Sequence, residues 1–245
     1  MQRIEIFEKY NTVTAFLSQK PDRASELIPM LARKLKAEEY LIKPHLVHGD
    51  RVLAVTWDLF KSLREKAEEY PELSDIPGYI EVNDTDGLIT DVPGCALVST
   101  HGDCIPVFVF DPIRRAAGIA HAGWKGTRLG IAERLVKALQ SEYGCLPENI
   151  KVYIGPGIGS CCFKVTEEVV LQFRSTSEWM EEFIEKQDDI HWTLDLKGIN
   201  RRYLELQGVR DIELSPDCTC CMEDKYWSYR RCGEMDRMLA YIRIN

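Results

Sequence analysis

The stretch from Val98 to Gly126 constrains the fold more than any other part of the chain. It contains two short apolar runs, Ile105 to Phe110 and Ala116 to Ala120, which are separated by the turn-like sequence DPIRR. Two such runs joined by a short turn are typical of neighbouring β-strands. Cys104 precedes the first run and His121 follows the second, so pairing of the two strands brings these side chains close together.

A glycine-rich segment, Gly123-Trp124-Lys125-Gly126, follows His121. The next residues, Thr127 to Gly144, predict the clearest helix of the chain, with Thr127 as its N-cap and one apolar face. Backbone N–H groups at the start of such a helix can bind an anion, and Lys125 adds a mobile positive charge. Many glycine loops before helices bind nothing, so the segment alone does not establish an anion site.

The remaining pattern predicts helices and short strands in a mixed order. Helical or irregular segments are expected at Pro21–Lys36, Thr56–Pro71, Thr166–Phe173 and Leu196–Gly208. Strands are expected within Leu41–Val55 and at Gly87–Thr90, Cys95–Ser99, Ile150–Ile154 and Val209–Leu214, with an edge-like strand at Leu239–Ile244 and a surface excursion at Ser175–His191. This pattern predicts one α/β (α+β) domain over residues 1–245, without repeats.

Composition and charge narrow the class of protein. A net charge of −8 over 245 residues argues against nucleic acid as a partner, because phosphate binding requires a basic face. The first residues lack the pattern of a signal peptide, and no apolar run approaches the roughly 18 residues of a membrane span. We therefore expect a cytoplasmic protein without a membrane partner, in which the 9 cysteines are mostly thiols.

The histidines decide which metal chemistry is available. There are only 5, too few for the several copper ions of a conventional laccase. A single ion is within reach, since His48, Cys104 and His121 would give zinc three ligands and leave a fourth position open. His48 precedes Gly49-Asp50, at the expected end of a strand. Without a metal, Cys104 could instead act as a thiolate nucleophile with His121 as its base.

Other residues carry weaker signals. His101 and Asp103 flank Cys104 and could carry protons or stabilise the loop by hydrogen bonds. Arg230 and Arg231 could bind a phosphate or carboxylate, although paired arginines are more often at the surface or in salt bridges. Without a catalytic role, Cys104 could simply be a small residue of the core. His121 could likewise be a histidine at a strand end that hydrogen-bonds a backbone carbonyl. Cys218, Cys220 and Cys221 lack a second C-x-x-C or a nearby histidine, so we expect thiols of mixed burial.

An ordered set of motifs resembles a known family. The motifs are Val47-His48-Gly49, Asp86-Gly87-Leu88-Ile89-Thr90, Asp103-Cys104-Ile105-Pro106, Ala120-His121-Ala122-Gly123-Trp124-Lys125-Gly126, Ile154-Gly155-Pro156 to Cys161-Cys162, Cys218-Thr219 and Ser228-Tyr229-Arg230-Arg231. Over residues 40–244 the sequence is similar to the YfiH/YlmD-type proteins, formerly called multicopper polyphenol oxidoreductases with a laccase domain and now regarded as purine nucleoside phosphorylases. It departs from the common patterns at Gly102, where the family often has alanine, and at Met235-Asp236-Arg237, where it often has T-G-R.

The resemblance implies a single CNF1/YfiH-like domain of mixed β-sheets flanked by helices. It implies Zn²⁺, with Cu²⁺ as an alternative ion, on His48, Cys104 and His121, which would also be the catalytic residues. It further implies phosphorolysis of adenosine, inosine, guanosine and S-methyl-5′-thioadenosine, together with deamination of adenosine. Lys125 and Arg230 are our candidates for binding phosphate. Three alternatives stay open: laccase-like phenol oxidation, a cysteine-type hydrolase acting in peptidoglycan editing, and a binding protein without catalysis. The sequence leaves the oligomeric state open, and a monomer is one of the possible states.

Overall fold

Two six-stranded sheets form the centre of the structure, a computed structural model that describes residues 1–36, 38–69 and 76–245. The first sheet has the order β1 (Gln2–Arg3), β2 (Val13–Leu17), β15 (Met238–Ile244), β7 (Cys95–His101), β3 (Tyr40–Pro44) and β5 (Tyr79–Val82). The second has the order β14 (Asp211–Leu214), β10 (Lys151–Ile154), β8 (Ile105–Asp111), β9 (Ala116–Ala122), β6 (Gly87–Thr90) and β4 (Val52–Ala54). Both sheets mix parallel and antiparallel pairs.

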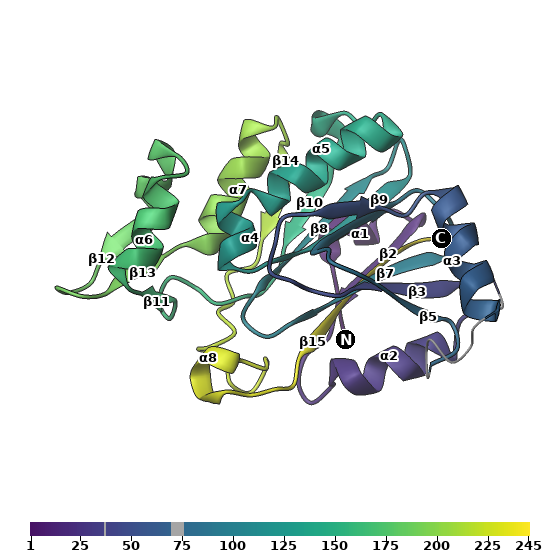
Figure 1. The fold of residues 1–245 in the computed structure, drawn as a ribbon, viewed down its shortest axis with the longest axis horizontal. Coiled ribbons are helices and arrows are strands. Elements are labelled where there is room, and N and C mark those ends of the chain that lie inside the picture. The colour runs from purple at the N-terminus through teal and green to yellow at the C-terminus, as the bar shows by residue number, and fades with distance from the viewer. Residues whose placement is uncertain (37, 70–75) are drawn as a thin grey trace.

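The two sheets pack face to face, and helices cover their outer faces (Figure 1). Between the sheets lies a core to which Phe108 of β8 and Leu97 of β7 contribute fully buried side chains. Helices α5 (Ile131–Tyr143) and α7 (Leu196–Leu206) cover the second sheet, and α2 (Ala24–Ala32) covers the first. The central strands β7, β8 and β9 read as apolar runs because both of their faces are buried in this arrangement. The predicted class, mixed β-sheets flanked by helices, is therefore confirmed.

A third, three-stranded sheet lies to one side of these layers (Figure 1). It consists of β11 (Lys164–Val165), β13 (Trp192–Leu194) and β12 (Ile184–Lys186), with α6 (Glu167–Arg174) and the 3₁₀ helix η3 (Glu178–Phe183) beside it. The expected surface excursion at Ser175–His191 therefore contains both a helical turn and a strand.

The remaining elements are short apart from one helix. They are α1 (Glu5–Glu8), α3 (Trp57–Glu69), α4 (Trp124–Arg128), η2 (Pro147–Asn149) and α8 (Tyr229–Cys232). Helix α3 accounts for most of the helical segment expected at Thr56–Pro71, of which Tyr70 and Pro71 lie outside the described residues. Within the described part of the chain, each helix falls short of the length and apolarity that a membrane span requires.

The helix predicted from Thr127 to Gly144 is broken in two. Gly130 has a left-handed backbone with φ 78° and begins α5, whereas Thr127 lies inside the preceding short helix α4. Instead of capping a helix, the hydroxyl of Thr127 accepts a hydrogen bond of 2.9 Å from Nδ2 of Asn200 on α7. The sequence pattern did not reveal the break because the apolar stripe of α5 begins immediately after it, at Ile131.

The last strand was wrongly expected at a sheet edge. β15 pairs with β2 on one side and with β7 on the other, and six of its seven residues are buried. An end-of-chain position favoured an edge, but an antiparallel strand can enter the middle of a sheet from either terminus. Ile242 lies opposite Ala15 and Leu97 and is fully buried between the two large sheets.

The position of β15 makes Ile242→Ala costly. We expect the free energy of unfolding to fall by about 2–5 kcal/mol, since a cavity would open in a packed core. The matched control is Ile113→Ala in the β8–β9 turn, where the side chain is 68% exposed and the change should stay within about 0.5 kcal/mol. Denaturant unfolding of both variants measures the difference. Equal effects would place β15 outside the core.

Candidate metal centre and cleft

Three side chains from separate parts of the chain converge at one end of the β8–β9 pair. His121 lies opposite Pro106 in the strand register, so Cys104, just before β8, comes beside it. His48 comes from the loop between β3 and β4, where its φ of 58° places it in the left-handed region, and not at a strand end as expected. One ligand atom from each of His48, Cys104 and His121 lies within 4.8 Å of the others, so the predicted convergence is found.

Asp86, which precedes β6, organises this group from behind. Its fully buried carboxylate contacts Nδ1 of His121 at 3.1 Å and accepts backbone N–H bonds from Val47, His48 and Gly49 at 3.2, 3.0 and 2.7 Å. A carboxylate on Nδ1 fixes the ring so that Nε2 faces a metal or substrate. The three backbone bonds fold the loop so that it presents His48.

The centre is tightly packed around Gly123. A Cβ on this residue would lie 3.1 Å from Sγ of Cys104 and 3.3 Å from Cδ2 of His48. A side chain would therefore intrude among the candidate ligands. This close approach explains why a glycine follows the strand at this point.

Charge couples Cys104 to His121. Burial alone would raise the pKa of the Cys104 thiol, but the charge of His121 and hydrogen bonds from His121 and His48 lower it to about 6. Burial opposes the charged form of His121, yet Cys104 and Asp86 raise the pKa of its imidazole to about 9. Without a metal, the pair is therefore a thiolate and an imidazolium at neutral pH.

His101 supports the centre from inside the core. Its Nδ1 lies 3.1 Å from the carbonyl oxygen of Cys104, and its ring centroid lies 5.4 Å from that of His121. Burial, together with the charge of His121, holds the pKa of His101 well below its usual range. The structure thus shows the hydrogen bond that sequence reasoning offered as one role of this residue.

A cleft of about 380 Å³ opens over the three candidate ligands. Apolar and aromatic side chains form much of its wall, while arginines contribute positive charge. The lining residues beyond the candidate ligands include Leu46, Trp124, Ile158, Phe163, Leu196, Tyr229, Arg230 and Arg237. A cavity of this size with few polar groups is typical of a small-molecule site.

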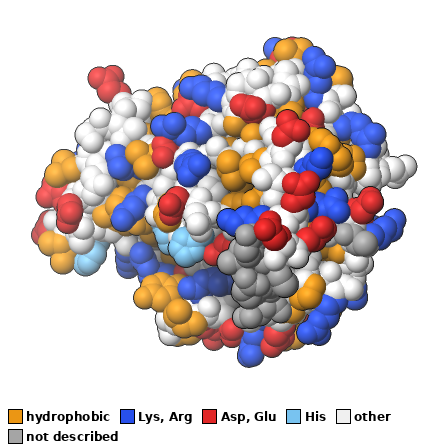
Figure 2. All heavy atoms as spheres, turned by 45° about the vertical axis from the view of Figure 1, so that its right-hand side comes forward, with side chains coloured by type: hydrophobic (Ala, Val, Ile, Leu, Met, Phe, Trp, Pro, Cys, Tyr) orange, Lys and Arg blue, Asp and Glu red, His pale blue; other side chains and the backbone are white. Residues whose placement is uncertain are grey.

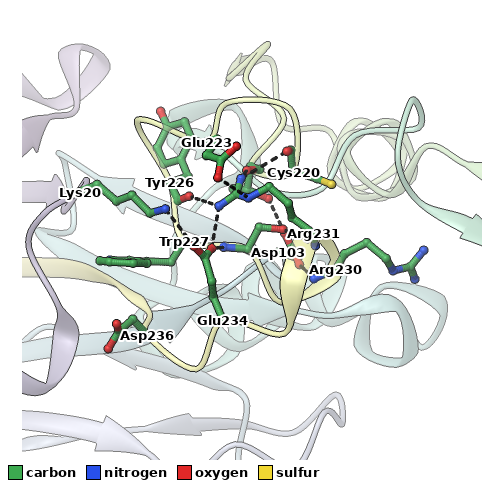
Figure 3. Close-up of polar contacts among 12 residues, drawn as sticks. Lys20, Asp103, Cys220, Glu223, Tyr226, Trp227, Arg230, Arg231, Glu234 and Asp236 are labelled. Carbon is green, nitrogen blue, oxygen red and sulfur yellow. Dashed lines mark hydrogen bonds and ion pairs between the residues drawn. The ribbon is translucent and has the colours of Figure 1, made fainter.

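The two neighbouring arginines at the end of the chain have different roles. Arg231 is half-buried, and its guanidinium binds the Glu234 carboxylate at 2.6 Å and the carbonyls of Thr219 and Cys220. Arg230 lines the cleft, and its side chain points away from this network (Figure 3). The backbone N–H of Arg230 donates to Asp103 at 2.7 Å. Arg231 therefore shapes the loop. The guanidinium of Arg230 lies 5.2 Å from the ring centroid of Phe163, and its Nη1 donates to the carbonyl of Lys164 at 2.9 Å. Nε and Nη2 of Arg230 have no hydrogen bond among the described residues, so these two nitrogens are the donors left for a ligand.

Lys125 lies outside the residues that line the cleft. Its side chain is exposed, and Nζ lies 5.6 Å from the ring centroid of Trp124, which does line the cleft. The sequence analysis did not single out Arg237 or the aromatic wall. Arg237 packs closely on Gly102, where a Cβ would lie 2.7 Å from Cδ of Arg237. The departure at Gly102 therefore adjoins the arginine that this chain shares with the T-G-R pattern.

The fold and the site together define an α/β protein with a candidate metal centre beneath a small-molecule cleft. Residues 6–245 match the model of the family described as multi-copper polyphenol oxidoreductase laccase, and the chain belongs to this family. The predicted resemblance to YfiH/YlmD-type proteins is confirmed.

Three similar proteins illustrate the relationship. Purine nucleoside phosphorylase YlmD of Geobacillus stearothermophilus is 39% identical over 64% of this chain and 59% of its own length. Purine nucleoside phosphorylase LACC1 of Mus musculus is 35% identical over 64% of this chain and 37% of its own. The chain thus spans 59% and 37% of the length of these two curated relatives, which is less than two thirds of each. The crystal structure of Bacillus licheniformis hypothetical protein YfiH has a TM-score of 0.81 and 30% identity, covering 97% of this chain and 95% of that one.

The charge coupling predicts how Asp86→Asn alters Cys104. Loss of the carboxylate lowers the pKa of His121, so less imidazolium remains to stabilise the thiolate. We expect the pH midpoint for alkylation of Cys104 in chelator-treated protein to move from about 6 towards the ordinary thiol value. Mass spectrometry of the labelled peptide against pH measures this midpoint.

Asp84→Asn is the matched control. Asp84 is exposed two residues earlier and makes no contact with His121 among the described bonds, so the midpoint should stay where it is in the unaltered protein. An identical midpoint in Asp86→Asn and Asp84→Asn would show that the carboxylate does not control the pair.

Proposed function

We propose that this protein is a zinc-dependent purine nucleoside phosphorylase. Adenosine, inosine, guanosine and S-methyl-5′-thioadenosine are the proposed substrates with phosphate, and deamination of adenosine is a proposed second activity. The observation that carries the proposal is the convergence of His48, Cys104 and His121 beneath a cleft with an apolar wall and Arg230 at its side. Relatives in the same family are named purine nucleoside phosphorylases.

The donor set of the centre fits zinc. Two imidazoles and one thiolate are ligands that zinc prefers, and the lowered pKa of Cys104 keeps its sulfur in the form that binds metal. The Asp86 contact to His121 is the hydrogen bond that metal-bound histidines commonly make. With a fourth position open, the ion would supply a Lewis acid and a bound water of lowered pKa. Cu²⁺ is the alternative ion on the same ligands.

The cleft supplies groups for binding and orienting a nucleoside with phosphate. Trp124, Phe163 and Tyr229 offer aromatic faces on which a purine can stack. Arg230 offers planar donors to a phosphate, and Lys125 is the second cation that we propose for this anion. In phosphorolysis, a phosphate oxygen bonds to C1′ of the ribose while the C1′–N9 bond breaks and its electrons leave with the purine. The aromatic and cationic side chains contribute by holding the nucleoside and the phosphate next to each other in one cleft.

A cysteine-type hydrolase is the second candidate function. The thiolate and imidazolium forms of Cys104 and His121 are those of an activated nucleophile and its acid–base partner. A metal-bound thiolate is not free to attack, so the two functions exclude each other at this sulfur. The effect of a chelator separates them, since it abolishes metal chemistry but frees the thiolate.

The partners that we propose are small molecules, namely purine nucleosides and phosphate. We further propose that the protein acts in the cytoplasm. On the face shown in Figure 2, acidic and basic side chains are interspersed outside the grey residues, as expected for a protein that does not bind nucleic acid there. The cysteines are free thiols in the structure, which fits a reducing compartment.

Product analysis tests the proposed function. Adenosine with phosphate should give adenine and ribose 1-phosphate, and a chelator should abolish this activity because the centre loses its ion. Chromatography of reactions with and without phosphate identifies the products. Release of the base at the same rate with and without phosphate would contradict the proposal. Activity that survives complete removal of the metal would also contradict it and would favour the hydrolase.

Lys125→Ala tests the proposed phosphate ligand. We expect an increase of roughly tenfold in the KM for phosphate, with a smaller effect on the KM for nucleoside, because one charged contact is lost. Lys186→Ala is the matched control, for which the KM for phosphate should not change. Nζ of Lys186 lies 5.7 Å from the ring centroid of Trp192, so this lysine makes a similar contact with a tryptophan, but neither residue lines the cleft. An unchanged KM in Lys125→Ala would remove Lys125 from the phosphate site.

A further inference from the structure

Four cysteine side chains from two loops meet at a place separate from the residues that line the cleft. Cys161 and Cys162 come from the loop after β10, and Cys218 and Cys221 come from the loop after β14. Their four sulfurs all lie within 4.8 Å of one another, and we call this group the four-cysteine cluster. Sequence reasoning considered Cys218 and Cys221 without a partner set, because Cys161 and Cys162 are more than fifty residues away.

Backbone contacts hold the two loops in register. Gly157 and Cys218 form an isolated parallel bridge, and Thr219 donates its N–H to the carbonyl of Gly157 at 3.1 Å. Gly159 lies between the loops, where a Cβ would be 3.2 Å from Sγ of Cys161 and 3.3 Å from Cβ of Cys218. The glycine therefore permits the close approach of the sulfurs.

The spacing of the sulfurs matches the coordination sphere of a tetrahedral metal ion. Sγ of Cys221 lies 3.5 Å from that of Cys161 and 3.4 Å from that of Cys162. Zinc–sulfur bonds of about 2.3 Å in a tetrahedron place sulfurs roughly 3.8 Å apart. Disulfide sulfurs are bonded at about 2.05 Å, and these cysteines are free thiols.

The surroundings favour negative charge on one sulfur of the cluster, that of Cys218. The N–H of Gly159 donates to Sγ of Cys218 at 3.2 Å, as backbone groups do around metal-bound thiolates. Nζ of Lys197 is held at the base of the second loop by the carbonyls of Ser215 and Asp217. Arg231 donates to the carbonyls of Thr219 and Cys220 (Figure 3). Both cations therefore lie beside the segment that carries Cys218 and Cys221.

We propose that the four-cysteine cluster binds a second metal ion, Zn²⁺, as a closed structural site separate from the His48–Cys104–His121 centre. Four thiolates from two loops fill a tetrahedral sphere and leave no position for substrate. Soft thiolate ligands select zinc over hard cations such as Mg²⁺ or Ca²⁺.

The proposed ion would fix the wall of the cleft. The first loop carries Ile158 and Phe163, and the second leads to Tyr229 and Arg230, all of which line the cleft. Thr219, next to Cys218, donates to Asp103 at 2.7 Å, and Asp103 also accepts the N–H of Arg230. A crosslink between the loops thereby connects the cluster to the segment that begins with Cys104.

Metal counting on zinc-loaded protein tests the proposal. Cys221→Ser should lower the zinc content by about one ion per chain relative to the unaltered protein, because a closed site loses one of its four ligands. Cys232→Ser is the matched control, since Cys232 is exposed and outside the cluster. Elemental analysis after gel filtration gives the count. An equal zinc content in Cys221→Ser and Cys232→Ser would overturn the proposal.

A second measurement avoids variants that fail to fold. Zinc should protect Cys161, Cys162, Cys218 and Cys221 from alkylation in the native protein, and a chelator should expose all four. Alkylation of the four at equal rates with and without zinc would contradict the site. A thiol count below 9 in freshly denatured protein, with disulfide-linked peptides from the cluster, would show an oxidised pair and also overturn it. Neither measurement uses nucleoside activity, so failure of the proposed phosphorylase function leaves the outcome readable.

Discussion

The buried carboxylate of Asp86 is the interaction on which the candidate metal centre depends. It accepts three backbone N–H groups from the loop at residues 47–49 and contacts His121 on β9. Burial of a charge without such partners would be costly, so these contacts explain how an ionised group is tolerated at full burial. One carboxylate therefore defines the loop conformation, the orientation of one imidazole and the local electrostatic balance. The Asp86 carboxylate thus joins strand β9, which carries His121, to the loop at residues 47–49.

The sandwich of sheets places this chemistry where buried strands meet the connections between elements. His121 belongs to the β8–β9 pair, whose seven paired residues on each strand are buried, and Cys104 directly precedes β8. Arg230 and Tyr229 belong to loop-borne segments at the end of the chain. The candidate ligands Cys104 and His121 thus lie at the end of a buried strand pair, whereas part of the cleft wall comes from loops and the short helix α8. Such a division is common where a scaffold holds chemistry and loops decide what binds.

Local patterns predicted much of the fold, and long-range contacts account for what they missed. The β8–β9 pair could be predicted because its runs, turn and end residues are adjacent in the chain. The same local reasoning failed for β15, whose neighbours β2 and β7 are far away in sequence. It also failed for Thr127, whose hydroxyl is used by Asn200 of α7. The three candidate ligands were named from the sequence and from family motifs, but the roles of Asp86 and Arg237 depend on contacts that no spacing rule encodes.

The backbone of His48 has a consequence for how the centre exchanges with solvent. His121 is fixed in a strand ladder and Cys104 directly precedes one, but His48 lies on an exposed loop and has a left-handed backbone itself. The side chain of Asp86 holds this loop through its backbone N–H groups. Brief local opening of such a loop costs far less than unfolding of a sandwich. An ion could therefore enter or leave through transient release of one imidazole, while the other two ligands stay in place. If the centre binds a metal ion, the loop that carries His48 would then set its rate of exchange.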